Sequence, residues 1–152
     1  MKIVDLYGWG LPHQAEFLSH FKGNDAQLRL AQQLWAELDS CTVWFMITFI
    51  VVAIVSAVIY YGPYNNRPER HYMVKHWLLW MAIAGGVAFV ISFLIGAIGV
   101  NSPMTSFKYP LVLYISSMNI LYSIGVYFVM SLYFCNVNFP KTNAYRFLKI
   151  GK

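Results

Sequence analysis

The sequence predicts an all-α integral membrane protein with three transmembrane helices, built as a single domain of 152 residues. Three stretches without an ionised side chain predict the spans, and they lie between Asp39 and Arg67, between His76 and Lys108, and between Lys108 and Lys141. Each stretch is long enough to cross a bilayer, because a spanning helix needs roughly 20 mostly apolar residues. The composition agrees, since charged residues make up 11% of the chain against about 25% in soluble domains. A soluble fold of this size would have too few polar residues to cover it.

The N-terminal part, residues 1–23, is apolar but broken by glycines and by Pro12. A helix from Pro12 to Phe21, with proline near its first turn and an apolar side, is typical of a segment that lies at the membrane interface. A frayed terminus, or one docked on a partner, is the alternative.

The next element begins at Asn24, a good N-cap residue, with Gln27 in the capping-box position. We expect one helix over 25–61, since this range contains neither glycine nor proline. Its second half would cross the bilayer and its first half would extend beyond it. The extended half carries one apolar stripe at helical spacing, made of Leu28, Ala31, Leu34, Trp35 and Leu38.

The second and third spans are predicted over 77–100 and 110–135, followed by a basic tail over 136–152. Lys and Arg are concentrated in the connector 62–76 and in the tail, whereas loop 101–109 has one. Because basic residues remain on the cytoplasmic side, we expect an inner-membrane protein with its N-terminus outside and its C-terminus in the cytoplasm. Three crossings place the two cysteines on opposite membrane faces, which excludes a disulfide between them.

Two helix faces stand out. Small residues gather on one face of the second span, and they include Gly85, Ser92, Gly96 and Gly99. Such a face indicates close helix packing within the chain, packing between subunits, or a narrow pore wall. A polar stripe follows the third span, made of Ser116, Asn119, Ser123, Tyr127 and Ser131. It indicates either hydrogen bonding between helices or a hydrated surface, since an amide facing lipid would be unsatisfied.

No Asp, Glu, Lys, Arg or His lies inside a predicted span. This argues against active transport and against chemistry within the bilayer, because both normally place such groups at membrane depth. We therefore expect a protein that is not an enzyme and has no cofactor.

Basic residues near the predicted cytoplasmic mouth could bind an anion such as a nucleotide. They are Arg67, Arg70, His71, Lys75, His76, Arg146 and Lys149. Alternatively, the same residues set the topology and contact anionic lipid headgroups.

His13, Glu16 and His20 share one face of a helix, as zinc ligands could. The wet side of an interfacial helix would have the same pattern.

The leading hypothesis is a closed homo-oligomeric channel or pore, because three helices cannot enclose a water path alone. It would be lined by the polar stripe or the small face and gated by an anionic ligand. In size and architecture such a chain resembles the small membrane effectors of bacterial anti-phage systems. The main alternative is a non-conducting scaffold or anchor of a larger membrane complex, which would dock a partner protein through the stripe of the first helix. The partners expected besides lipid and further copies of the chain are a nucleotide-like anionic ligand or a cytoplasmic partner protein. An interfacial metal-dependent enzyme is the third alternative.

Overall fold

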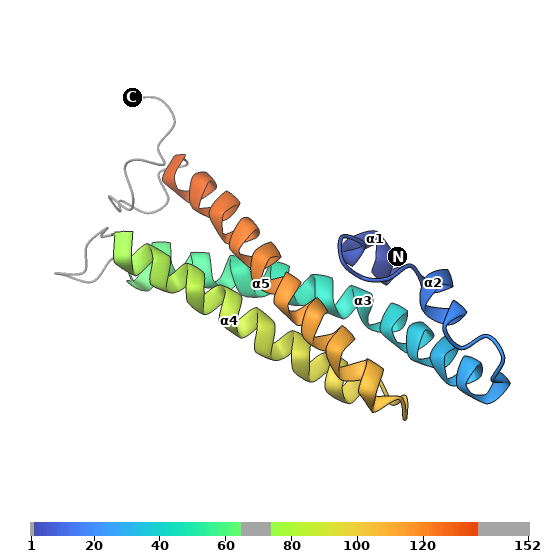
Figure 1. The fold of residues 1–152 in the computed structure, drawn as a ribbon. Coiled ribbons are helices and arrows are strands. Elements are labelled where there is room, and N and C mark those ends of the chain that lie inside the picture. The colour runs from blue at the N-terminus through green and yellow to red at the C-terminus, as the bar shows by residue number, and fades with distance from the viewer. Residues whose placement is uncertain (1, 65–73, 137–152) are drawn as a thin grey trace. The chain divides into compact units, whose positions relative to one another are not determined.

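The computed structural model of the chain describes residues 2–64 and 74–136, and in these ranges it contains helices and no strand. Two short helices come first, α1 (Ile3–Tyr7) and α2 (Gln14–Ser19). The long helix α3 (Asp25–Ile59) follows and continues into a π-helical turn, η1 (Tyr60–Tyr64). Helices α4 (Val74–Gly99) and α5 (Thr105–Asn136) complete the described fold (Figure 1).

Three of these helices are long and apolar enough to cross a membrane, as the sequence predicts. They are α3 together with η1, α4 and α5. The chain divides into two compact units, and each of the three helices contributes one part to each unit. The first unit comprises Met1–Ile47 and Phe89–Asn119, and the second comprises Thr48–Ala88 and Ile120–Lys152.

The third long helix begins earlier than predicted, at Thr105 rather than at Pro110. Proline in the second turn removes only one backbone hydrogen bond, so it does not stop the helix from starting upstream. The first turn is tied down locally, because the Met104 amide donates to the Ser102 hydroxyl at 3.4 Å and the Lys108 amide donates to the Met104 carbonyl at 2.9 Å.

The predicted helix from Pro12 to Phe21 is shorter in the structure and covers only Gln14–Ser19. It ends at Ser19 because side chains bond the backbone there. The Ser19 hydroxyl donates to the Glu16 carbonyl at 2.6 Å, and the His20 Nδ1 lies 2.9 Å from the same carbonyl. Helix α1, which the sequence analysis did not predict, begins where the Asp5 carboxylate accepts a hydrogen bond from the Lys2 amide at 2.8 Å.

The start of α3 follows the prediction. The Asn24 side-chain oxygen accepts a hydrogen bond from the Gln27 amide at 3.2 Å, which satisfies one free donor of the first turn. Gly23, directly before the cap, has a φ of 110° that only glycine adopts readily.

The apolar stripe of α3 is buried inside the first unit. Ala31 and Leu34 are fully buried, Trp35 and Leu38 are nearly so, and the Trp35 ring lies 5.5 Å from that of Phe17. The N-terminal segment, residues 2–23, lies against this part of α3 (Figure 1). In this conformation the chain itself covers most of the stripe, and Leu28 at its start is half-buried. Docking of a partner protein on this stripe stays a prediction.

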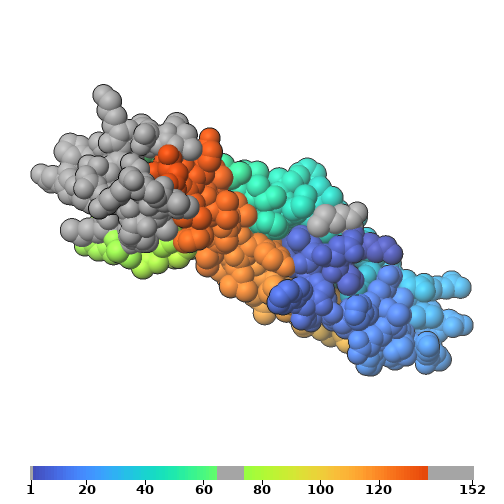
Figure 2. Space-filling view, turned by 90° about the horizontal axis from the view of Figure 1, so that it is seen from above, coloured from blue at the N-terminus to red at the C-terminus, as the bar shows by residue number. Residues whose placement is uncertain are grey.

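The predicted interfacial segment also has its apolar side against the protein. Its buried side chains are Ile3, Tyr7, Leu11, Phe17 and Phe21. The space-filling view shows the segment lying over the first part of α5 (Figure 2), where the Phe107 ring meets those of Phe17 and Phe21 at 5.8 and 5.4 Å. Burial of these side chains removes the apolar face that an interfacial helix would give to lipid.

The second unit has an aromatic core. Its buried members are Ala53, Ala57, Tyr60, Tyr61, Trp77, Ala84, Tyr127 and Phe134. The rings of Tyr60 and Tyr61 meet edge to face at 4.8 Å, and Trp77 lies 6.0 Å from Tyr127. These rings are larger than most core side chains, and alanines on α3 and α4 make the room for them.

Candidate functional site

Asn119, the most polar side chain in the three predicted spans, lies in a buried hydrogen-bond network of the first unit. The Tyr7 hydroxyl donates to the Asn119 side-chain oxygen at 2.7 Å. The Asn119 amide group donates to the Ser92 hydroxyl at 2.6 Å and, at 3.5 Å, to the carbonyl of Phe45. The amide is completely buried and yet hydrogen-bonded through both its oxygen and its nitrogen, which removes most of the cost of burying it.

Two contacts hold Tyr7 over this network. The first residue of α1 is tied to α3, because the Ile3 amide donates to the Asp39 carboxylate at 2.8 Å. One helical turn later the Tyr7 ring packs edge to face on Phe45, with ring centres 6.4 Å apart. The N-terminal segment thus places the Tyr7 hydroxyl on the side-chain amide of Asn119, which is 112 residues away in the sequence.

The rest of the predicted polar stripe is equally buried. Ser116, Ser123, Tyr127 and Ser131 all have no exposed surface. Ser116 donates to the Val112 carbonyl at 2.8 Å, one turn back on its own helix. In the second unit, the Ser131 hydroxyl accepts a hydrogen bond from the Trp77 indole at 3.0 Å and donates to the Tyr127 carbonyl at 2.8 Å.

Two hydroxyls of the stripe have no hydrogen-bond partner in the part of the chain that the structure describes. They are those of Ser123 and Tyr127, both in the second unit. All five members of the stripe are nevertheless buried in the single chain. Ser116, Asn119 and Ser131 hydrogen-bond within the chain, as the hydrogen-bonding interpretation of the pattern expects. A hydrated surface along this stripe stays a prediction.

The small face of α4 is used mainly for packing inside each unit. A β-carbon added at Gly96 would lie 2.5 Å from a γ-carbon of Val112, and one added at Gly85 would lie 2.9 Å from Ile120. Such close approach needs glycine, and Ser92 between them is fully buried. Gly99 is exposed at the end of the helix, where an added β-carbon would lie 3.1 Å from the Cys41 sulfur.

The basic candidates are described only in part. Lys75 is exposed at the start of α4. His76 is half-buried, and its Nδ1 lies 3.0 Å from the Tyr64 hydroxyl. The remaining five, Arg67, Arg70, His71, Arg146 and Lys149, lie outside the described residues.

The possible zinc ligands are not brought together. Within residues 2–64 and 74–136 no group of three or more His, Cys, Asp or Glu is placed to hold a metal ion. His13 precedes the six-residue helix α2 and His20 follows it, so the spacing that would align them on one face of a continuous helix is lost.

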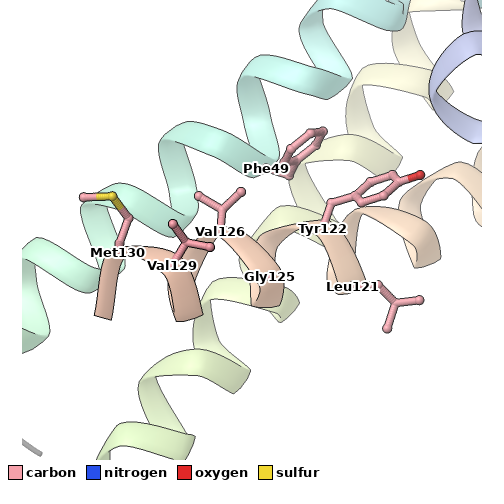
Figure 3. Close-up of a pocket in the computed structure, with 7 residues that line it drawn as sticks. All are labelled: Phe49, Leu121, Tyr122, Gly125, Val126, Val129 and Met130. Atoms are coloured by element: carbon pink, nitrogen blue, oxygen red, sulfur yellow. The ribbon is translucent and has the colours of Figure 1, made fainter. Parts of the chain in front are cut away.

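An apolar groove of about 360 Å³ lies on the second unit between α3 and α5 (Figure 3). Its lining residues are Phe49, Leu121, Tyr122, Gly125, Val126, Val129 and Met130. The groove exists because Gly125 has no side chain and no atom lies within 4 Å of where its β-carbon would be. The side chains drawn there are hydrocarbon apart from the Met130 sulfur and the Tyr122 hydroxyl, so the groove offers surface for apolar contact and no catalytic group.

Sequence reasoning missed the roles of Tyr7 and Lys108. The Lys108 ammonium is buried and donates to the carbonyls of Ala97, at 2.8 Å, and Val100. It thereby satisfies carbonyls at the C-terminal end of α4, where a cation is favoured. A lysine within one turn of the predicted span was a signal for this role, whereas nothing in the spacing of Tyr7 pointed to Asn119.

The chain matches no protein-family model, no curated protein and no solved structure.

Proposed function

We propose that the chain is a multi-pass membrane protein in which α3, α4 and α5 each cross the bilayer. Helix α4 has 26 residues and would be about 39 Å long, more than the roughly 30 Å of hydrocarbon in a bilayer. Its outward side chains are aliphatic, with Ile98 exposed by 73% and Leu94 by 50%. Exposing an apolar surface of this kind to water would be strongly unfavourable, whereas lipid would cover it.

The distribution of basic residues supports an inner-membrane orientation with the N-terminus outside and the C-terminus in the cytoplasm. Tags placed at the two ends test this orientation. In spheroplasts a membrane-impermeant protease should remove the N-terminal tag and leave the C-terminal tag. Removal of both tags, or of neither, would contradict three crossings.

Within the membrane we propose a non-conducting role, as a subunit or anchor of a larger membrane assembly. The observation that carries this proposal is the burial of the entire polar stripe, from Ser116 to Ser131, inside the chain. A pore wall must be able to contact water, and in this conformation these side chains contact only the chain's own helices. Among the described residues, the surface that remains for a partner includes the aliphatic outward side chains of α4 and exposed polar side chains on the first part of α3, such as Gln32 and Gln33.

The non-conducting role and the channel hypothesis predict opposite results in a conductance experiment. Purified protein is reconstituted into planar bilayers and recorded over a range of voltages, with and without a nucleotide. We expect no unitary currents. Reproducible currents that Asn119→Leu abolishes, together with a closed ring in the mass of the detergent-solubilised particle, would favour the channel instead.

The interfacial enzyme has no assembled metal-binding group among the described residues to support it. Metal analysis of the purified protein tests that alternative directly, because stoichiometric zinc would restore it.

A further inference from the structure

The N-terminal segment, residues 2–23, is held in place almost entirely by tertiary contacts. Its helices have five and six residues, far below the roughly 12 that an isolated helix needs. Its order therefore comes from the side chains it buries on α3 and α5, such as Phe17 against Trp35. A segment of this kind can detach as one piece, because nothing inside it opposes detachment.

The Asn119 network lies directly under this segment. Asn119 bonds Ser92 and the Phe45 carbonyl through its nitrogen, and it receives a hydrogen bond on its oxygen from Tyr7. When Tyr7 leaves, no described donor remains for that oxygen. A buried carbonyl oxygen without a donor strongly favours water, so departure of the segment and entry of water are coupled.

The connection between the segment and α3 has the character of a hinge. Gly23 has a φ of 110°, and no atom lies within 4 Å of where its β-carbon would be. A residue with a β-carbon fits the space but is strained by the backbone angle. The closed position of the segment thus depends on glycine at this point for conformational rather than steric reasons.

We propose that residues 2–23 form a hinged cover that controls the access of water to the Asn119 network. Closed, the cover supplies the Tyr7 hydroxyl and keeps the network dry. Open, it exposes the Asn119 and Ser92 side chains from the side that Tyr7 occupies. The cover belongs to this end of the chain alone and would operate whether or not the protein conducts.

Thiol labelling tests the cover. In a background of Cys41→Ala and Cys135→Ala, the reporter Ser92→Cys is reconstituted in lipid nanodiscs and treated with a charged, membrane-impermeant maleimide. A thiol reacts as the thiolate, which needs water, so the labelling rate reports hydration. Ser123→Cys provides the matched control, because Ser123 is fully buried in the second unit and has no hydrogen-bond partner among the described residues.

Two changes weaken the closed state by different routes. Tyr7→Phe removes one hydrogen bond and keeps the ring on Phe45, and Gly23→Ala strains the hinge without a clash. We expect Tyr7→Phe to speed labelling of Ser92→Cys by about twofold to tenfold, the range for one hydrogen bond. Gly23→Ala should speed it by at least about twofold, because a residue with a β-carbon is strained at a positive φ. Trp9→Phe, at a side chain that is 95% exposed, should leave the rate unchanged.

The labelling rates at positions 92 and 123 together support or overturn the cover. Faster labelling at position 92 alone supports the cover. Equal acceleration at 92 and 123 means that the variants loosen the whole fold, and this overturns the proposal. No acceleration at 92 from either variant also overturns it, since the network would then be dry without Tyr7.

Discussion

The close approach of α4 to α5 at Gly96 gives the sharpest stability prediction. A methyl group added there would lie 2.5 and 2.8 Å from the two γ-carbons of Val112, and 3.2 Å from its β-carbon. Valine has one strongly preferred rotamer in a helix, so it cannot rotate away easily. Gly86 lies ten residues earlier on the same helix, is exposed, and has no atom within 4 Å of an added β-carbon.

The two glycines separate helix propensity from packing. Replacing glycine by alanine inside a helix stabilises it by about 0.8–1 kcal/mol, and this gain applies at both positions. Overpacking at Gly96 costs about 1–3 kcal/mol, whereas Gly86→Ala meets nothing. We therefore expect Gly96→Ala to be less stable than Gly86→Ala by about 1–3 kcal/mol.

Unfolding by SDS in mixed micelles, followed by circular dichroism, measures both free energies. The double variant Gly96→Ala/Val112→Ala provides the rescue, because truncation of valine removes the atoms that clash. The loss of unfolding free energy in the double variant should be smaller than the sum of the two single losses by about 1 kcal/mol or more. Equal effects of the two glycine substitutions, within about 0.5 kcal/mol, would refute the close contact between α4 and α5.

Three further predictions use the same unfolding assay. Asn119→Leu should lower the free energy of unfolding by about 1–3 kcal/mol, because it leaves buried hydroxyl partners without their amide; an unchanged value would contradict the network. Lys108→Met should cost a similar amount, about 1–3 kcal/mol, since the carbonyls at the end of α4 lose a charged donor, and high salt should not reproduce the loss if the ammonium is buried as described. Tyr127→Phe should be neutral or stabilising by up to about 1–3 kcal/mol, as it removes a buried hydroxyl without a described partner, while the matched change Ser131→Ala should destabilise because Trp77 loses its acceptor. The reverse order for this last pair would mean that the Tyr127 hydroxyl has a partner.

The sequence located much of the candidate site on particular helix faces. It could not predict what each of those faces contacts. Periodicity placed Asn119 and its serines on one face of a helix, and it placed Gly96 on another. A face is only a direction around one helix axis, and the same pattern fits a neighbouring helix, a second subunit or water. In the structure the whole stripe is buried against the chain's own helices, which the pattern alone could not indicate.

The N-terminal segment marks the limit of local reasoning. Its composition predicted an apolar helix from Pro12 to Phe21 at a membrane surface. Helix α2 covers only Gln14–Ser19, and at its end the side chains of Ser19 and His20 both bond the Glu16 carbonyl. The docking of Tyr7 on Asn119 joins residues 112 positions apart. No periodicity extends over that separation, so no pattern in the chain could predict it.

The three long helices follow from the sequence alone, because the absence of charge over more than 20 residues and the 3.6-residue repeat are properties of consecutive side chains. The N-cap at Asn24 and the burial of one stripe on α3 follow for the same reason. Which helix each face meets was decided by tertiary structure, since close packing selects among partners by shape at distances that sequence does not encode. The glycine at position 96 shows both parts: the small residue is visible in the chain, and only the fold reveals that Val112 is what it makes room for.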